Sequence, residues 1–441
     1  MRRIHLLNEV RVEKPREIAL RLLQREAGGD FIENRLAAAL ARGRLSAADR
    51  HLCQELAYGV VRWQAALDWL IARKTDARQL KPALRALLRL GLYQIFWLER
   101  IPPHAAVHET VALARASRLH AQTGFINAVL RGYLREQEAT RRLLAELKTR
   151  QPHLGYSHPE WLVTRWRERW GPEAAVKLMD WNNTPPRVFA RVNTLKTDAD
   201  RLLAQWRAEE VEYGLVRRDW LAENLVFELR AHPPLSRLPS FQQGMFYVQD
   251  PSTLLAVSEL GAQPGERVLD LCAAPGGKLT ALAQAMRNEG RLFAHDTSPE
   301  RLDLIRQNCA RLGVSCVQPQ TPADLEAPGA AAGFDRILLD APCSNTGVMR
   351  RRVELRWRVQ PEEIDRLQAQ QRELLRQAAA RLKPGGALVY STCSLEPEEN
   401  AGVLREFLRQ HPGFKLERAR ELLPFVDGVD GSYVARISRG S

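Results

Sequence analysis

Two cysteines stand in similar surroundings, each after a short apolar run that predicts a strand. Cys343 comes after Arg336-Ile-Leu-Leu-Asp-Ala-Pro, Cys393 comes after Leu388-Val-Tyr-Ser-Thr, and a serine follows each of them. A lone cysteine is usually a buried packing residue. Two cysteines at the ends of expected strands, each beside small polar residues, indicate instead a pair of reactive thiols.

A thiolate can activate an electron-poor pyrimidine ring for methylation. Carbon 5 of cytosine is a poor nucleophile, but addition of a thiolate to carbon 6 makes an enamine, whose carbon 5 can attack a methyl sulfonium. A base then removes the proton on carbon 5, and the thiolate leaves. Covalent catalysis of this kind divides one difficult step into easier ones. Because a free thiol with a pKa of about 8.5 is mostly protonated at neutral pH, a nearby cation such as Lys278 would assist.

The string from Val268 to Lys278, Val-Leu-Asp-Leu-Cys-Ala-Ala-Pro-Gly-Gly-Lys, predicts a strand, a loop of small residues and the start of a helix. Small residues let a ligand approach the backbone, and a helix amino end offers free N–H groups. A phosphate-binding loop would need glycine at 272 and serine or threonine at 279, but Cys272 and Leu279 stand there. The dinucleotide fingerprint is also absent. The loop therefore suits a different cofactor, with a simple tight turn as the alternative.

Asp296 follows the next apolar run, Leu292–His295, at about the distance where an acidic residue accepts hydrogen bonds from ribose hydroxyls. A helix-capping aspartate is the alternative. We predict that Asp296 binds the cofactor together with the loop residues, which are Cys272, Ala273, Ala274, Pro275, Gly276, Gly277 and Lys278.

Three of these strings, in this order, resemble the RNA cytosine-C5 methyltransferase family of the NOL1/NOP2/Sun type. They are Asp270–Lys278, Asp340-Ala-Pro-Cys-Ser344 and Ser391-Thr-Cys-Ser394, and Pro397-Glu-Glu-Asn400 adds to the likeness. The front half is similar to one branch, the bacterial small-subunit (16S) rRNA enzymes with a NusB-like helical RNA-binding domain. That similarity rests on Leu67–Leu70, Gly91–Gln94, Arg100–Ala105 and Ile126–Arg131.

The resemblance implies S-adenosylmethionine as the cofactor and a role for each catalytic residue. By this likeness Cys393 is the nucleophile, and Cys343 assists proton removal and product release. Asp340 would sit between the methionine end of the cofactor and the target base. The residues alone leave the choice of cysteine open, because DNA cytosine methyltransferases attack with a Pro-Cys thiol like Cys343. The family usually has an acidic residue for adenine where this chain has Thr321, so we expect Thr321, or Asp324 nearby, to take that place.

The same resemblance implies small-subunit rRNA as the substrate, at the hairpin-loop cytosine conventionally numbered 967. A tRNA cytosine-C5 methyltransferase and a non-catalytic RNA-binding assembly factor are the alternatives. Arg350, Arg351 and Arg352 closely follow the Cys343 loop and are predicted to grip phosphates beside a flipped base, although a solvated charge run is the usual interpretation. Asn193 and Lys196 are predicted to line an RNA path.

The elements that must position these residues are predicted from about residue 248 onward, where strands alternate with helices. Such alternation indicates a parallel sheet covered on both faces, with ligands beyond the carboxyl ends of its strands. The expected strands are Arg267–Leu271, Arg291–His295, Arg336–Leu339 and Ala387–Tyr390, and the expected helices are Leu279–Met286, Glu300–Leu312 and Glu362–Leu382.

The fold class we predict is multidomain. Residues 1–150 form an all-α, NusB-like RNA-binding domain, residues 151–247 a small α+β connector, and residues 248–441 a Rossmann-like α/β methyltransferase domain. Expected helices in the first domain include Lys14–Arg25, Ala105–Leu119 and Thr123–Leu134, and Pro82 suits the first turn of another. The polar stretch Gln151–Pro159 predicts a linker.

The formal net charge of +13 is unevenly placed, because residues 1–150 alone carry +12. A basic module beside a neutral one favours a polyanionic partner for the first domain. The six cysteines form no C-x-x-C pair, so we expect no metal and no disulfide. With no signal peptide and no apolar run of about 18 residues, we expect a cytoplasmic protein that binds no membrane. We expect a monomer, and the sequence names no protein partner.

Overall fold

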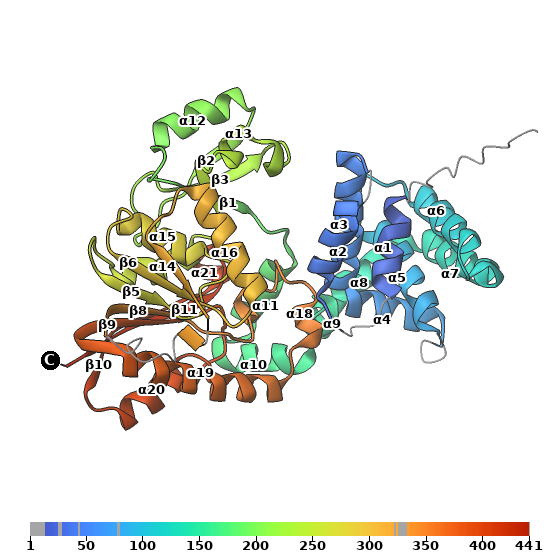
Figure 1. Cartoon of the computed structure of the whole chain (residues 1–441). Helices are drawn as coiled ribbons and strands as arrows, with labels where there is room; N and C mark the ends of the chain where they lie inside the picture. Colours follow the sequence, from blue (N-terminus) through green and yellow to red (C-terminus); the bar gives the residue numbers. More distant parts are fainter. Residues whose placement is uncertain are drawn as a thin grey trace, which may run out of the picture. The chain divides into compact units, whose positions relative to one another are not determined.

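The computed structural model describes residues 14–24, 29–42, 45–76, 80–321, 323–324 and 333–440, which fold into two compact units (Figure 1). The first unit runs to Thr184 and takes in Met349–Arg358, and the second holds Pro185–Val348 and the chain from Val359 onward. The first unit therefore extends beyond the predicted 1–150 domain, and the predicted domain boundaries stay a prediction. The reason is that helix α9, Pro152–Gly155, lies within the expected linker and packs against α4 and α8 of the first unit.

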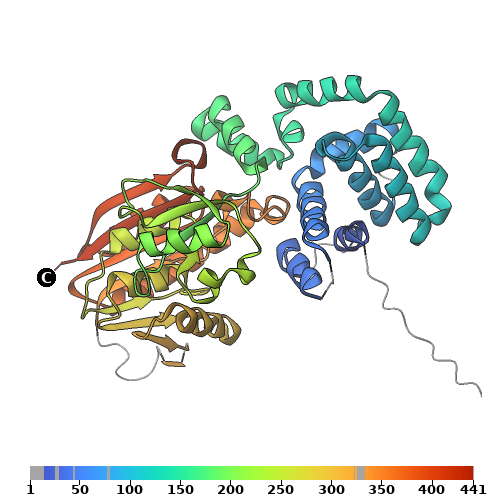
Figure 2. The ribbon, with the colours of Figure 1, turned by 90° about the horizontal axis from the view of Figure 1, so that it is seen from above.

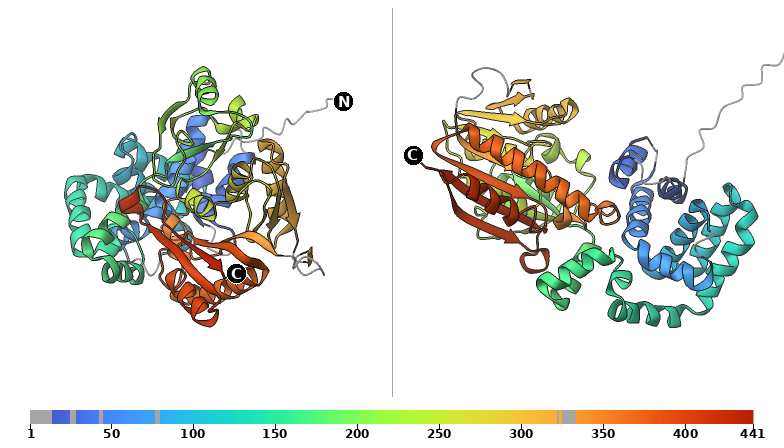
Figure 3. Two further views of the ribbon diagram at one scale, coloured as in Figure 1. Left: turned by 90° about the vertical axis from the view of Figure 1, so that its left-hand side faces the viewer. Right: turned by 90° about the horizontal axis from the view of Figure 1, so that it is seen from below.

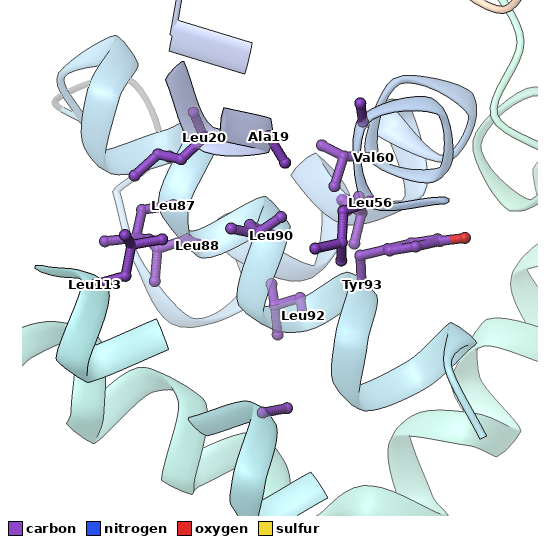
Figure 4. Packing of buried hydrophobic residues seen from close by; sticks show 14 of the residues in the cluster. Ala19, Leu20, Leu56, Val60, Leu87, Leu88, Leu90, Leu92, Tyr93 and Leu113 are labelled. Carbon is purple, nitrogen blue, oxygen red and sulfur yellow. The ribbon is translucent and has the colours of Figure 1, made fainter. Parts of the chain in front are cut away.

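The described part of the first unit is entirely α-helical apart from short 3-10 turns, as predicted. In α5 the expected proline starts the helix, and Leu87, Leu88, Leu90 and Leu92 are fully buried (Figure 4). An almost wholly apolar helix of this kind is stable only when other helices surround it. The helices are α1 Pro15–Gln24, α2 Ile32–Arg42, α3 Ala47–Arg62, α4 Gln64–Lys74, α5 Pro82–Trp97, α6 Pro103–Ala116, α7 Thr123–Arg135, α8 Gln137–Arg150, α9, α10 Glu160–Trp170, α11 Pro172–Asn183 and α18 Leu355–Arg358.

The segment Met349–Arg358 is an integral part of this helical unit, although it follows the Cys343 loop in the sequence. Its Val353 belongs to the hydrophobic core, and Trp357 Nε1 donates to the carbonyl of Val61 at 2.8 Å. The guanidinium of Arg356 is fully buried. It donates to neutral oxygens, which are the carbonyls of Arg62 (3.3 Å), Ser157 (3.2 Å) and Asn182 (2.9 Å) and Oδ1 of Asn183 (2.8 Å). A fragment of residues 1–150 would lack this segment, so RNA binding has to be tested on the full chain.

The second unit begins with a small antiparallel sheet of strand order β2-β3-β1-β4, covered by helix α12 (Figure 2). Trp206 of α12 is fully buried and packs edge-on against Phe227 and Phe246 of the sheet. The predicted α+β character of this region is confirmed. The elements are β1 Val188–Val192, α12 Ala199–Ala208, β2 Glu212–Leu215, β3 Val226–Ala231, α13 Pro239–Gln242 and β4 Phe246–Val248.

A seven-stranded sheet of order β10-β11-β9-β8-β5-β6-β7 forms the rest of the second unit. The five strands β5–β9 are parallel to their neighbours, and β11 and β10 join antiparallel at one edge. The parallel sheet was predicted and is confirmed, whereas the two antiparallel strands were not expected. The strands are β5 Arg267–Asp270, β6 Arg291–His295, β7 Val317–Gln320, β8 Phe334–Asp340, β9 Leu382–Thr392, β10 Phe414–Leu422 and β11 Ser432–Arg439.

Helices cover both faces of this sheet (Figure 3). Alternate strand residues point to opposite faces, so Val268 and Leu338 pack in one apolar cluster while Leu269 and Leu339 pack in the other. The first cluster is completed by α14 Ser252–Leu260, α15 Gly277–Ala285 and α16 Pro299–Leu312, and the second by α19 Pro361–Arg381 and α20 Ala401–Gln410. Within the described ranges, no helix is long and apolar enough to cross a membrane.

Candidate active site

Four neighbouring strands end at one edge of the large sheet, and each carries residues that the sequence singled out. The strands stand in the order β9, β8, β5, β6. The residues that follow them are Cys393, Cys343, the loop from Leu271 to Gly276, and Asp296. Because parallel strands deliver their carboxyl ends to the same edge, side chains from four separate stretches of sequence meet there.

The two thiols are adjacent, with Sγ of Cys343 3.4 Å from Sγ of Cys393. The Cys393 thiol donates to Oδ1 of Asn345 at 2.9 Å, and the Asn345 amide donates to the carbonyl of Cys343 at 2.6 Å. Cys343 is buried, and the hydrogen bond to Cys393 together with that burial raises the pKa of its thiol well above the usual value. At neutral pH Cys343 therefore holds its proton.

An ion pair stands beside the thiols, because Nζ of Lys278 lies 2.6 Å from Oδ2 of Asp340. Ser391, paired with Asp340 across the two strands, donates its hydroxyl to the other carboxylate oxygen at 2.8 Å. Burial alone would lower the pKa of Lys278, but the Asp340 carboxylate outweighs it and raises that pKa. Lys278 is thus held as a cation, and the charge of Cys393 also acts on it.

Asp270 ends β5 and is 1% exposed. Among the described residues, no donor makes a hydrogen bond of normal geometry to either of its carboxylate oxygens. Burial, followed by the negative charge of Asp340, raises the pKa of Asp270 to about 8, against the opposing effects of Lys278 and the Cys272 backbone. Buried carboxylates are normally paired with donors or cations, so the surroundings of Asp270 are unusual for this group.

The cofactor loop is fixed by contacts from outside it. Its Gly276 has a φ of +100°, a backbone conformation that favours glycine. Asp296 is buried and accepts from the Ala274 N–H at 3.3 Å, and Arg301 lies 3.4 Å from the same carboxylate. Arg191 of β1 donates to the Gly277 carbonyl at 2.8 Å. The small sheet therefore supports the start of α15.

The remaining loop residues lie within this same stretch. Burial, then the charge of Asp270, raises the pKa of the Cys272 thiol. Ala273 is buried and donates its N–H to the carbonyl of His295, so the loop is tied to the end of β6. Asn308 of α16 donates to the Pro275 carbonyl at 2.9 Å.

Thr321 directly follows β7 and is exposed. Oδ2 of Asp324 accepts from both the N–H and the hydroxyl of Thr321, each at 2.7 Å. The Asp324 carboxylate is thus partly occupied by its own turn. The prediction that Thr321 or Asp324 holds an adenine stays a prediction.

Two residues expected to line an RNA path donate hydrogen bonds to the backbone of neighbouring turns. Asn193 is 1% exposed, and its amide donates to the carbonyls of Gly244 (2.7 Å) and Leu312 (2.8 Å). The Lys196 ammonium donates to the carbonyls of Gln243 (3.0 Å) and Arg311 (2.7 Å). The expectation for Asn193 is wrong because its side chain is buried, whereas Lys196 is exposed and for it the prediction stays open.

The arginine run after the Cys343 loop is also not a uniform charged surface. Arg350 is 2% exposed, and its guanidinium lies 3.9 Å from the ring centre of Trp181. A buried arginine stacked on an indole cannot grip a phosphate, so this prediction is wrong for Arg350. Arg352 is exposed and Arg351 is half-buried, and for these two the prediction stays open.

Three residues of the site were not predicted from the sequence. Asp270 and Asn345 lie within or beside strings that were recognised, but no role was assigned to them. Glu399 is fully buried and contacts the serines that follow both cysteines. A strand-end acid before a glycine loop was a usable signal for Asp270. Glu399 had only the weaker signal of belonging to the Pro-Glu-Glu-Asn string.

A second candidate site is a groove between α6 and α7 in the helical unit. The residues that line it include Val107 and Val111, which are buried. Basic side chains line its walls, namely His104, His108, Arg115, Arg131 and Arg135. No Asp or Glu is among the residues that line it, and Glu109 stands beside it, 3.7 Å from His108. A basic groove of this kind suits a polyanion.

The parallel sheet, its helices on both faces and the functional groups at its carboxyl edge define a Rossmann-like methyltransferase. Sequence models of three protein families match the chain. The RsmB/F family of 16S rRNA methyltransferases matches residues 257–436, the NusB family matches residues 13–135, and the ferredoxin-like domain of RsmF/B-like methyltransferases matches residues 158–226.

Similar proteins extend this match over nearly the whole chain. A Bacillus subtilis protein named probable ribosomal RNA small subunit methyltransferase B is 34% identical over 454 residues, covering 96% of this chain and 98% of its own. A Klebsiella pneumoniae protein named ribosomal RNA small subunit methyltransferase B is 38% identical over 407 residues, covering 89% and 91%. The chain therefore belongs to the RsmB/F family of 16S rRNA methyltransferases. The crystal structure of the protein PH0851 has a TM-score of 0.77 at 25% identity and covers 97% of this chain and 100% of its own.

Proposed function

We propose that this protein methylates carbon 5 of a cytosine in small-subunit rRNA, with S-adenosylmethionine as the donor and Cys393 as the nucleophile. The observation that carries the proposal is the pair of thiols 3.4 Å apart beside the Lys278–Asp340 ion pair. The names of the similar proteins favour rRNA over tRNA as the substrate. The target we propose is the hairpin-loop cytosine at position 967.

The proposed reaction uses the two cysteines in sequence. The Cys393 thiolate adds to carbon 6 of cytosine, and the electrons of the 5,6 double bond make carbon 5 nucleophilic enough to take the methyl group. The ammonium of Lys278 favours the thiolate form of Cys393 because an opposite charge stabilises an anion. Once Cys393 is bonded to carbon 6, its hydrogen bond to Cys343 and its negative charge no longer raise the pKa of Cys343, so that thiol can lose its proton to solvent. The Cys343 thiolate then accepts the proton from carbon 5. The double bond then re-forms and the bond between Cys393 and carbon 6 breaks.

The residues present fit the proposed methyl donor. The buried carboxylate of Asp270 is suited to the ammonium at the methionine end of S-adenosylmethionine, and Asp296 to its ribose. The loop from Cys272 to Lys278 would hold the rest, and Asp340 would lie between donor and base. When bound, this cofactor supplies a methyl group on a positively charged sulfur.

The proposed function is tested by mapping the methylated nucleotide. Purified full-length protein is incubated with S-adenosylmethionine and either small-subunit rRNA or a mixture of tRNAs, and bisulfite sequencing then locates 5-methylcytosine. We expect a single modified cytosine, in the rRNA only. Modification of tRNA, or of no RNA under conditions where the protein binds rRNA, would exclude the proposal.

A prediction also follows for the groove between α6 and α7, which we propose as a contact for the rRNA backbone. The double substitution Arg115→Glu with Arg131→Glu should weaken RNA binding by the full chain by about tenfold or more at low salt, and should flatten the salt dependence. The control is Arg141→Glu with Arg142→Glu, an equal charge change at two exposed positions of α8 outside the groove. Equal losses in the two double variants would indicate a diffuse charge effect instead of a defined groove.

A further inference from the structure

Glu399 is a buried acid that the proposed reaction does not use. It lies in the turn between β9 and α20 and is 0% exposed. Among the described residues, no lysine or arginine lies within ion-pair distance of its carboxylate. An isolated buried carboxylate is costly unless hydrogen-bond donors surround it. The arrangement of those donors therefore indicates what the residue is for.

Four hydrogen bonds saturate the carboxylate of Glu399. Oε1 accepts from the Ser344 N–H at 2.8 Å and from the Gln371 amide at 2.9 Å. Oε2 accepts from the hydroxyl of Ser344 and from that of Ser394 at 2.5 Å. A carboxylate has about four lone-pair sites, so none is left for another partner.

These donors belong to the two cysteine loops. Ser344 directly follows Cys343, Ser394 directly follows Cys393, and the two hydroxyls lie 3.0 Å apart. Gln371 of α19 also donates to the carbonyl of Pro342, which precedes Cys343, at 2.8 Å. One carboxylate thus joins the ends of two strands at the position immediately after each thiol.

The two loops also touch where no side chain would fit. The Gly347 N–H donates to the Cys393 carbonyl at 2.9 Å. A Cβ at Gly347 would stand 2.8 Å from that same carbonyl and 2.4 Å from the carbonyl of Gly431. The backbone at Gly347 therefore fixes one contact between the two loops, and the Glu399 carboxylate fixes another at the serines that follow the cysteines.

We propose that Glu399 is a positioning residue for methyl transfer, which sets the separation of the Cys343 and Cys393 sulfurs by fastening the serine that follows each of them. This inference rests on the proposed function. Carbons 5 and 6 of the pyrimidine are bonded neighbours, so the nucleophile at one and the thiol that acts at the other have to be close and fixed. Glu399 acts through the serines and not on the RNA, because all its acceptor sites are filled.

The negative charge of Glu399 has a second, smaller effect. It is among the causes that keep the pKa of Cys343 raised, after the hydrogen bond to Cys393, burial and the charge of Cys393. Substitution by glutamine separates the two effects. It removes the charge but keeps the size, and an amide can hold all four contacts if the two serine hydroxyls turn to accept.

The test compares Glu399→Ala and Glu399→Gln in the full-length protein, with small-subunit rRNA and S-adenosylmethionine as substrates. We expect Glu399→Ala to lower kcat by about 100-fold, the usual consequence of a misplacement of about 1 Å, with unchanged KM for both substrates. Glu399→Gln should keep kcat within about tenfold of the wild type, because the contacts survive. Glu398→Ala, in the same turn, is the matched control and should keep the wild-type kcat.

A purely structural role predicts another pattern, with a lower melting temperature and raised KM values but little change in kcat of the folded enzyme. That pattern, or wild-type kcat in Glu399→Ala, would overturn the inference. If Glu399→Ala does not fold, the double variant Ser344→Ala with Ser394→Ala decides, since it removes two of the four contacts and should also lower kcat selectively. A wild-type protein that methylates no RNA would instead refute the proposed function itself.

Discussion

Replacement of Cys393 by alanine abolishes methyl transfer, by a factor of at least about 10⁴, if this sulfur is the nucleophile. The reason is that no other described nucleophile is placed to take over. The Cys343 thiol is 3.4 Å away. The variant loses the hydrogen bond to Cys393, the largest cause of the raised pKa of Cys343, but burial and the charge of Glu399 still raise it. The measurement is single-turnover transfer of a labelled methyl group to rRNA, with equal binding of S-adenosylmethionine by mutant and wild type as the folding control.

Cys343→Ala gives the complementary result. If Cys343 assists departure of the proton from carbon 5, its loss traps the methylated base on Cys393. We therefore expect a protein–RNA adduct that survives a denaturing gel. The double variant with Cys393→Ala should form none. An adduct in Cys393→Ala alone would reverse the two roles, and undiminished turnover in Cys393→Ser would rule out the covalent mechanism.

The sequence predicts those strands and helices whose apolar residues follow a clear pattern. Runs such as Ile337–Leu339 and Leu388–Tyr390 are buried on both faces of the sheet, and their continuous apolar character predicts central parallel strands. Strand β10 was missed because Phe414–Leu422 is an edge strand whose side chains are mostly exposed and charged, and nothing in its pattern distinguishes it from a loop.

The segment Met349–Arg358 shows a different limit. Its run of arginines predicts side chains that contact phosphates, with a solvated surface as the alternative, yet Arg350 and Arg356 are buried. Their partners are an indole at Trp181 and carbonyl oxygens as far back as Arg62, and such contacts leave no trace in local sequence. Asn193 was misassigned for the same reason, since backbone carbonyls from distant turns satisfy its amide.

The reactive groups of the candidate site could be predicted from the sequence, but the residues that position them could not. Cys343 and Cys393 could be found because each follows an apolar run and precedes a serine. Topology then brings them together, because β8 and β9 are neighbours in the sheet. Glu399 acts through side chains of two loops and one helix at once. That role depends on the tertiary arrangement, so sequence pattern alone could not assign it.

Binding of S-adenosylmethionine should strengthen as the pH rises toward 8, and Asp270 is the cause. Its pKa of about 8 means that the free protein carries a neutral Asp270 at pH 6, whereas an ammonium group favours the charged carboxylate. Binding must then expel the proton, and by linkage the affinity rises with pH below that pKa. Asp340, Lys278 and Asp296 also act on Asp270, with Lys278 opposing the rise in its pKa.

The expected gain in affinity is about tenfold between pH 6 and pH 7, before the donor's own α-amino group, with a pKa of about 8, loses charge. Titration calorimetry at pH 6.5 in buffers of different ionisation enthalpy should detect release of close to one proton per donor bound. Asp270→Asn should bind more weakly and show neither the slope nor the proton release. An affinity that is flat or falls over this range in the wild type would mean that Asp270 does not face the cationic end of the donor. The same carboxylate then could not be the group that draws the methionine end toward the thiols.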